Sequence, residues 1–262
     1  MDHFIIENRN EVKKLMVLAL HAGESMLKNG AETYRVEDTM VRICSSRENI
    51  KNVDAFVTQT GIFITLEYDG EIYSNFKRVK NISINLIKIN AINEFSRRFV
   101  CTNISIDEGL MTMKEIDNIR DYSRITKAIS GATSGAFFCV MFGGNLNDFI
   151  SSFAVSFIVI NILMQIDRLK LTFFIDNFIG AFLASLFAII TVKMGIGDNL
   201  DMIIIGSIMY LVPGVAITNA IRDTMSGDSL SGLSKGMEAI FSALAIAFGV
   251  GVVLNFYMKG FV

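Results

Sequence analysis

Five long apolar segments occupy the second half of this chain, and each has about the length that crosses a bilayer. They lie beyond Ile125 and are separated by short polar, glycine-rich connectors, at approximately Thr126–Phe142, Phe149–Ile166, Phe173–Met194, Met202–Ile221 and Met237–Tyr257. A helix needs about 20 mainly apolar residues to cross the hydrocarbon core. The segments therefore predict five transmembrane helices packed as a bundle.

Charged residues are concentrated ahead of these segments. Of the 24 Lys and Arg residues 17 precede Ile125, as do 18 of the 26 Asp and Glu residues. This segregation predicts a mainly α-helical membrane protein in which a small cytoplasmic domain, residues 1–125, is followed by a transmembrane domain, residues 126–262. The near-neutral charge of the first domain gives no reason to expect a nucleic-acid partner.

The first 125 residues have the pattern of an α+β domain. Apolar residues three and four apart predict a helix that Asn29-Gly30 ends, and a second helix from about Ala31 to Ser45. Further helices are expected over Asn81–Phe99 and from a capping box at Ser105, the last continuing toward the first membrane segment. Alternating stretches predict an antiparallel meander of three strands, at Val53–Gln59, Ile62–Tyr68 and Glu71–Arg78.

Positive charge in the connectors predicts the orientation in the membrane. Five cations fall on the side of the amino-terminal domain: Lys127, Arg168, Lys170, Arg222 and Lys235. Only Lys193 and Lys259 fall on the other side. Because cytoplasmic loops carry the excess of Lys and Arg, we expect a multi-pass protein of the cell membrane with its amino-terminus in the cytoplasm.

Pro213, the only proline of the chain, lies near the middle of the fourth apolar segment. Proline has no N–H and clashes with the carbonyl four residues earlier, so it predicts a broken membrane helix, which Gly214 loosens further. Transporters use such breaks to bind solutes near the bilayer centre. The N–H groups of Val215 and Ala216, at the start of the new half-helix, are expected to hold a substrate carboxylate.

Other polar residues near the break are candidates for the same site. Thr218 and Asn219 would add polar contacts, Arg222 would attract anions, and Asp223 would pair with Arg222 or take part in proton transfer. Asp176 and Glu238 are alternative proton carriers, since an ionised group within the bilayer is costly and so is often functional. An interfacial position, where the cost is small, is an equally good explanation of Asp176.

Metal and nucleophilic chemistry have little support in the sequence. Three widely spaced cysteines and two histidines form neither a metal-ligand spacing nor a nucleophile–histidine pair, so no cofactor, metal or catalytic residue is predicted. His21, which lies within an apolar helix face, is expected to be a packed side chain.

A polar cluster opens the second predicted helix: Glu32, Thr33, Tyr34, Arg35, Glu37 and Asp38. The simplest interpretation is an exposed helix surface whose charges pair with one another, because such pairs are common and weak. An interface with the membrane portion is the main alternative, and catalysis is a lesser one.

Two motifs resemble the signatures of the threonine/serine exporter family. The longer runs from Leu211-Val212-Pro213-Gly214 through Thr218-Asn219-Ala220-Ile221-Arg222-Asp223 to Ser231-Gly232, and the other is Asn29-Gly30-Ala31-Glu32-Thr33-Tyr34-Arg35-Val36-Glu37. Their order, and a soluble domain followed by five crossings, agree with that family over essentially the whole chain.

The resemblance implies export of threonine, serine or dicarboxylates such as succinate, coupled to the proton gradient. Similar full-length members of the family carry a second hydrophobic half of about the same size. We therefore expect a separate small multi-spanning membrane subunit to supply that half here. An oligomer is also possible. An odd number of crossings would let a related half insert in the opposite orientation.

Two other classes of function stay open. The cytoplasmic domain would act as a membrane-anchored hydrolase, an activity suggested for this domain in the family, although the missing nucleophile–histidine pair and metal cluster count against it. Alternatively, the chain would be a regulatory or scaffolding subunit whose partner forms the pathway alone.

Overall fold

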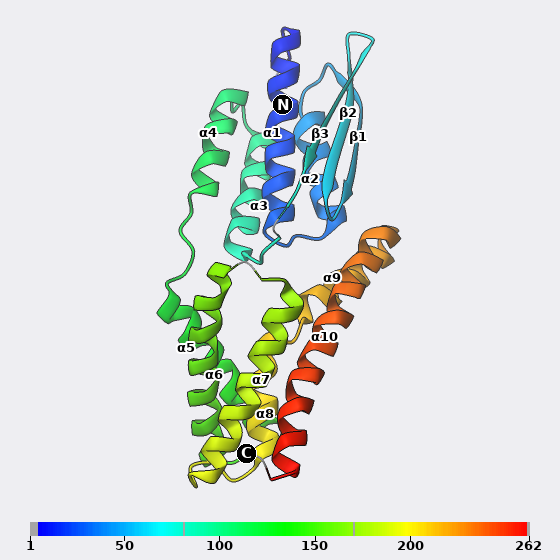
Figure 1. Ribbon diagram of the computed structural model, residues 1–262. Coiled ribbons are helices and arrows are strands. Elements are labelled where there is room, and N and C mark those ends of the chain that lie inside the picture. The colour runs from blue at the N-terminus through cyan, green and yellow to red at the C-terminus, as the bar shows by residue number, and fades with distance from the viewer. Residues whose placement is uncertain (1–4, 81, 170, 261–262) are drawn as a thin grey trace. The chain divides into compact units, whose positions relative to one another are not determined.

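The structure, a computed structural model, describes residues 5–80, 82–169 and 171–260, so Asn81 and Lys170 of the predictions above lie outside the described residues. The chain forms two compact units (Figure 1). In one, Thr218–Gly236 packs with the amino-terminal part of the chain as far as Asp121, and in the other Tyr122–Ile217 packs with residues from Met237 onward. Each unit is described by itself below.

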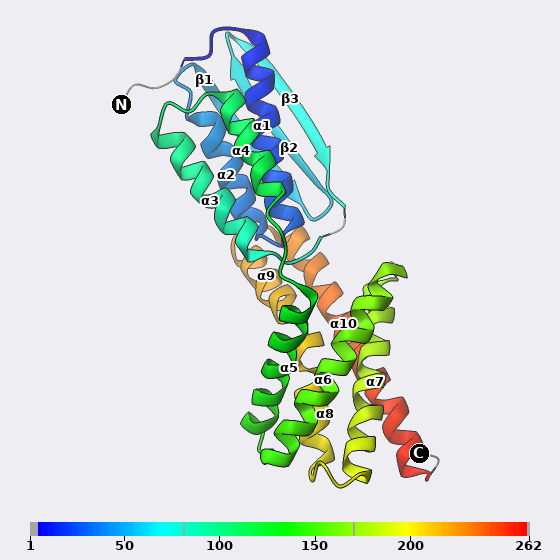
Figure 2. The same ribbon diagram turned by 90° about the vertical axis from the view of Figure 1, so that its left-hand side faces the viewer.

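The first unit is built around helix α1 (Arg9–Lys28), which packs against α2 (Thr33–Ser45), α3 (Leu86–Cys101), α4 (Ile106–Asp117) and the sheet (Figures 1 and 2). Its buried face includes Leu15, Ala19, Ala22 and Met26, at the predicted helical spacing. The helix ends where the sequence predicts, because Gly30 takes a φ of 88°, which a glycine tolerates at a helix carboxyl end.

The predicted meander is present as strands β1 (Ile50–Thr58), β2 (Gly61–Tyr68) and β3 (Glu71–Arg78), in the order β1-β2-β3. Both pairings are antiparallel. The tight turn at Asp69-Gly70 has positive φ at both residues, as a two-residue hairpin turn requires. Alternate residues of β2 are buried in the core of the unit: Ile62, Ile64 and Leu66.

The fourth helix is shorter than predicted. The Ser105 side chain accepts a hydrogen bond from the Glu108 N–H, as a helix amino-terminal cap should, but α4 ends at Asp117 instead of continuing toward the membrane segments. A new helix, α5 (Arg124–Met141), begins after a second cap at Ser123. The sequence analysis overlooked this second serine cap, which marks a separate helix start.

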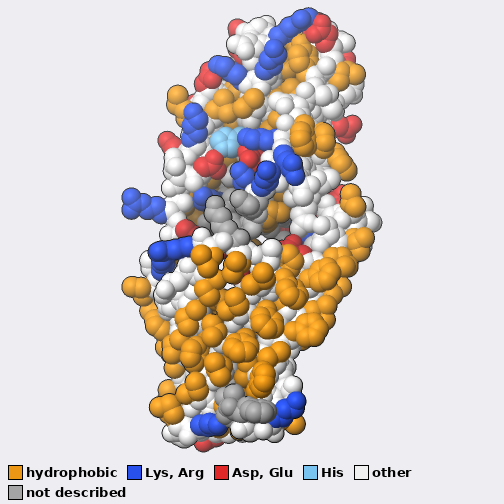
Figure 3. All heavy atoms as spheres, in the orientation of Figure 1, with side chains coloured by type: hydrophobic (Ala, Val, Ile, Leu, Met, Phe, Trp, Pro, Cys, Tyr) orange, Lys and Arg blue, Asp and Glu red, His pale blue; other side chains and the backbone are white. Residues whose placement is uncertain are grey.

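The second unit is helical. Besides α5 it contains α6 (Leu146–Ile166), the 3₁₀ turn η1 (Asp167–Leu169), α7 (Phe173–Lys193), α8 (Leu200–Ile208) and the 3₁₀ turn η2 (Met209–Leu211). The chain continues as α9 (Gly214–Met225) and α10 (Ser229–Met258), and each of these two helices has residues in both units. Hydrophobic side chains cover the visible face of the helical unit, whereas charged side chains gather over the unit that holds the sheet (Figure 3).

Three helices of the described chain are long and apolar enough to cross a membrane, namely α6 with η1, α7 and α10. A fourth is added if α8 with η2 and α9 form one broken span. The helix expected as the first crossing, α5, is outside this set, because it begins with Arg124, carries Lys127 in its first turn and contains several small polar residues. Five crossings therefore stay a prediction.

Close helix packing depends on two facing glycines. A Cβ atom added to Gly206 of α8 would lie 2.6 Å from the carbonyl oxygen of Gly135 in α5, closer than any real contact. Gly249 of α10 likewise lies against the backbone of α7, whereas Gly251 has nothing within 4 Å. Glycine thus permits close helix packing at Gly135, Gly206 and Gly249.

Candidate functional site

The predicted break at Pro213 is present in the structure. Helix α8 ends at Ile208, η2 continues to Leu211, and α9 begins at Gly214. Val212 is extended, the conformation that a residue before proline prefers. The two helical pieces are bent by 54° at this point. The segment is a broken helix and not a straight rod.

The first turn of α9 presents backbone donors. The Ile217 N–H donates to the Pro213 carbonyl at 3.0 Å, which starts the hydrogen bonding of the helix. The N–H groups of Val215 and Ala216 precede this bond and have no acceptor within their own helix. Gly214 and Val215 are exposed, so this turn is open to a solute.

A cavity of about 330 Å³ lies within the helical unit, close in sequence to the break. Tyr210 of η2 lines it, together with Asp176 of α7 and Asp167 of η1. Its other walls are apolar and come from α6: Ile160, Leu163 and Met164. The cavity thus combines a few polar groups with an apolar lining, which is the usual composition of a small-molecule site.

Two of the polar groups that line this cavity lack partners. The Asp176 Oδ1 and the Tyr210 hydroxyl are buried and form no hydrogen bond with any described residue. A buried polar atom without a partner costs about 1–3 kcal/mol, so it indicates a solute, a water or a proton that completes it. Asp176 is one of the predicted proton carriers, whereas the sequence analysis missed Tyr210.

A second polar constellation lies in the other unit and joins the two sequence motifs. Asp223 of α9 is fully buried, and its carboxylate accepts hydrogen bonds from the Thr33 N–H at 3.0 Å and the Thr33 hydroxyl at 3.1 Å. The Lys235 ammonium, 7% exposed, donates to the same carboxylate at 2.7 Å. Asp223 therefore accepts a hydrogen bond from a free N–H group at the amino-terminus of α2, although the two residues are 190 positions apart in the chain.

Glu32 forms a second link beside this one. Its carboxylate accepts from Arg222 at 2.6 Å and from Arg35 at 2.9 Å. Burial would raise the pKa of Glu32, but hydrogen bonds from its own backbone N–H and from Arg222, together with Arg35, outweigh burial and lower the pKa. The Asn219 amide donates to the Gly30 carbonyl at 3.1 Å. We call Gly30, Glu32 and Thr33, with Asn219, Arg222, Asp223 and Lys235, the motif junction.

Two further carboxylates lie near the motif junction. Glu37 accepts from the Val57 N–H at 2.8 Å. Burial raises the pKa of Glu37, and the charges of Asp228 and Asp223 raise it further against the effect of that hydrogen bond. Burial and the charge of Asp223 also raise the pKa of Asp228, while Lys235 opposes the rise. Lys235 therefore pairs with Asp223 and also acts on Asp228, while burial and neighbouring negative charge raise the pKa of both Glu37 and Asp228.

The remaining predicted residues are more exposed than those of the motif junction. Tyr34 is 39% exposed, Thr218 is exposed, and Glu238 is exposed on α10. Asp38 pairs with Arg42 on the surface of α2, as the exposed-surface interpretation predicts. The same interpretation is wrong for Glu32 and Thr33, which are buried by residues of the second motif.

Several functional candidates were missed by the sequence analysis. Lys235 was used only to orient the chain, and Asp228 was quoted only as part of a motif. The available signal was a lysine and an aspartate beside the glycine-rich connector between two apolar segments. An ionised group close to the bilayer is costly and therefore often functional. For Tyr210 the signal was a phenol hydroxyl inside an apolar run, which usually finds a partner when buried.

Comparison with protein families gives one match that spans most of the chain. The family model described as "Putative threonine/serine exporter" (ThrE) matches residues 17–257. No solved structure gives a significant match.

Curated proteins give distant relatives of two kinds. The "Probable succinate transporter subunit YjjP" of Klebsiella aerogenes is 22% identical and is aligned over 97% of both chains. The protein of the same name from Escherichia coli K12 is 23% identical, with 93% of this chain and 94% of that protein covered. The "Threonine/serine exporter" of Corynebacterium glutamicum is 22% identical over 94% of this chain, which spans 52% of that protein.

Proposed function

The chain belongs to the threonine/serine exporter family, and on that premise we propose that it is one subunit of an exporter of small polar metabolites. Its cargo is threonine or serine, or a dicarboxylate such as succinate. Relatives named for each kind of cargo match nearly the whole chain, which supports both choices.

One observation carries the proposal: a cavity next in sequence to a broken helix contains two buried polar atoms without partners. In a helical unit whose surface is apolar, the Asp176 Oδ1 and the Tyr210 hydroxyl raise the free energy of the empty state. A polar solute that entered would complete both groups and lower that free energy. We assign this cavity, with the N–H groups of Val215 and Ala216 in the first turn of α9, to the substrate pathway.

Proton coupling is assigned to Asp176, whose unpaired oxygen can take up a proton when the cavity is empty and release it when cargo binds. Glu238 is the alternative carrier. Thr218 is proposed to add a polar contact to cargo, and Pro213 and Gly214 to keep the helix open. Contact of cargo with Asn219 would require its bond to the Gly30 carbonyl to open. Direct contact of cargo with Arg222 or Asp223 would require their bonds at the motif junction to open.

The partner is a second multi-spanning membrane subunit. The relatives named as a transporter subunit support this assignment. We further propose five crossings, with α5 as the first, and a cytoplasmic amino-terminus. Together the two subunits would form a pathway at the junction of two inverted halves.

Efflux measurements in whole cells test the export function. Cells that lack this gene are loaded with radiolabelled serine, threonine or succinate and compared with complemented cells, with and without a gene for the proposed second membrane subunit. The expected result is that one class of cargo leaves only when both genes are present. Equal efflux with and without this gene for all three solutes would refute the export function.

Variants then test the site. Asp176→Asn and Tyr210→Phe should each reduce efflux at least tenfold while membrane insertion is unchanged, since each removes a group that the solute or proton completes. The matched controls are Asp201→Asn, an exposed aspartate on α8, and Tyr257→Phe on α10, which lie outside the cavity lining. Normal efflux in both cavity variants would remove this cavity from the pathway.

A further inference from the structure

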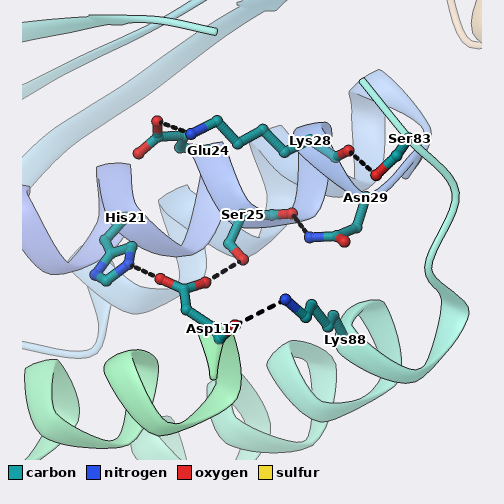
Figure 4. A pocket seen from close by; sticks show the side chains of 8 residues that line it. All are labelled: His21, Glu24, Ser25, Lys28, Asn29, Ser83, Lys88 and Asp117. Carbon is teal, nitrogen blue, oxygen red and sulfur yellow. Dashed lines mark hydrogen bonds and ion pairs between the residues drawn. The ribbon is translucent and has the colours of Figure 1, made fainter. Parts of the chain in front are cut away.

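A second cavity, of about 280 Å³, lies in the unit that contains the sheet, and Figure 4 shows its polar lining. His21, Ser25 and Lys28 come from α1, Lys88 from α3 and Asp117 from the end of α4. The sequence analysis treats His21 as a packed residue, but its Nε2 lies 2.6 Å from the Asp117 carboxylate. The export function proposed above uses none of these side chains.

The carboxylates of this cavity are already occupied. Glu24 pairs with Lys28 at 2.7 Å through one oxygen and with Lys77 at 2.5 Å through the other. Burial would raise the pKa of Glu24, but these two lysines outweigh burial and lower the pKa, so the carboxylate stays ionised. Asp117 accepts from the Ser25 hydroxyl at 2.8 Å with one oxygen and contacts His21 with the other. Neither carboxylate has an oxygen left without a neighbour.

The same contacts rule out one use of these residues. In a serine hydrolase the serine hydroxyl is bonded to the histidine that acts as its base. Here Ser25 and His21 both bind Asp117, which lies between them (Figure 4). The trio therefore holds the end of α4 against α1 and has no activated nucleophile.

Lys88, in contrast, has spare capacity. Its ammonium donates to the backbone carbonyl of Asp117 at 2.8 Å, and within the described part of the chain it has no carboxylate partner. An ammonium carries three N–H donors, so two remain for a ligand. The lining contains two lysines, Lys28 and Lys88, and Lys28 is already paired with Glu24, so Lys88 is the lining cation that a negatively charged ligand could use.

We propose that this cavity binds a small carboxylate anion, with Lys88 as its main charged contact. At about 30 Å³ per water molecule the space corresponds to roughly nine waters, which suits a metabolite of eight to ten non-hydrogen atoms. Lys88 supplies one charged contact for a carboxylate group, and inorganic phosphate, which is smaller than succinate, would fill less of the space. The proposal does not depend on the export function, because none of the groups involved lines the cavity that contains Asp176.

The ligand would also lie beside the motif junction. Asn29 lines the cavity and directly precedes Gly30, whose carbonyl accepts the hydrogen bond from Asn219. A carboxylate bound here would therefore lie beside Asn29, the first residue of the motif that continues to Glu37.

Calorimetric titration of the purified full-length chain in detergent tests the proposal. The probes are succinate, inorganic phosphate and succinamide, which has nearly the shape of succinate but no charge, all at constant ionic strength. We expect succinate to bind, and phosphate and succinamide to bind at least tenfold more weakly. Equal binding of succinamide, or tighter binding of phosphate, would overturn the assignment to a carboxylate.

Variants locate the binding. Lys88→Met should weaken succinate binding about tenfold or more, because a hydrogen bond to a charged group is lost. Lys88→Arg should restore most of it, and Lys13→Met, an exposed lysine of α1, should change it less than twofold. If Lys88→Met alters the fold, as hydrogen exchange of α3 and α4 would show, Lys28→Met serves as the second test.

Asp176→Asn separates this proposal from the export function. That variant should lose export and keep Lys88-dependent binding of succinate. Binding that is unchanged in both lysine variants, or that disappears in Asp176→Asn, would refute a carboxylate site in this cavity.

Discussion

The motif junction should be held mainly by the buried pair of Asp223 and Lys235, and this can be measured. At 2.7 Å and an effective dielectric constant of about 20, their attraction is about 6 kcal/mol before desolvation is subtracted. Removing one member of such a pair leaves an uncompensated buried charge, which costs about 3–5 kcal/mol. Asp223→Ala also removes the acceptor for the amino-terminus of α2, worth about 1 kcal/mol.

Hydrogen exchange of the full-length chain is the suitable assay. The Thr33 N–H donates directly to Asp223, so its exchange reports the opening of the junction. A loss of 3–5 kcal/mol corresponds to about 100- to 5,000-fold faster exchange in the first turn of α2 and in residues 218–236. Lys235→Ala should have a similar effect, because it leaves the Asp223 carboxylate buried without its cation.

The double variant decides whether the pair is responsible. If the two charges depend on each other, Asp223→Ala with Lys235→Ala should cost clearly less than the sum of the single variants, with a coupling of about 2–3 kcal/mol. The matched control is the surface pair of Asp38 and Arg42, whose removal should cost less than about 1 kcal/mol. Additive effects at Asp223 and Lys235 would refute the argument.

Three other predictions concern pH, helix packing and export. The pKa of Glu32 is lowered in the folded protein, so its stabilising contribution is complete above the unfolded pKa and is lost as pH falls through the folded pKa. The motif junction should therefore open more easily in acid. Glu32→Gln should abolish this pH dependence when hydrogen exchange is measured at several pH values. Gly206→Ala should lower the thermal midpoint by the equivalent of about 1–3 kcal/mol, because its Cβ meets a backbone carbonyl of α5, whereas Gly251→Ala should be neutral or stabilising. Pro213→Ala and Asn219→Ala should each abolish export without loss of membrane insertion, and normal radiolabelled efflux in both would remove the broken helix from the mechanism.

Local features of the fold could be predicted from the sequence because their causes are local. Asn29-Gly30 ends α1, Ser105 caps α4, and Asp69-Gly70 turns the chain between β2 and β3. The break at Pro213 belongs to the same group, since the missing N–H and the ring clash act within four residues. Two local errors remained. The end of α4 was missed because of a serine cap at Ser123, and α3 begins at Leu86, after a cap at Asn85, later than the predicted start near residue 81; the capping rule would have found both.

The contacts of the site could not be predicted, because they join residues far apart in the chain. Glu32 and Arg35 fit an exposed helix pair at three-residue spacing, and that pair exists. Nothing in that spacing indicates that Arg222 binds the other carboxylate oxygen of Glu32. The cavity beside Tyr210 was likewise hidden, since its walls come from four elements, α6, η1, α7 and η2, whose proximity a single sequence does not show.

The location of the buried charges separates two roles that the sequence analysis had combined. Asp223 and Arg222 were candidates for contact with cargo, yet their polar atoms bind Thr33, Lys235 and Glu32, and so are already satisfied. Asp176, in contrast, has an oxygen with no described partner. A site that must bind and release a solute needs groups that are incomplete when it is empty, whereas a satisfied buried pair resists exchange. This difference favours the cavity at Asp176 for transport and the motif junction for holding the two motifs together.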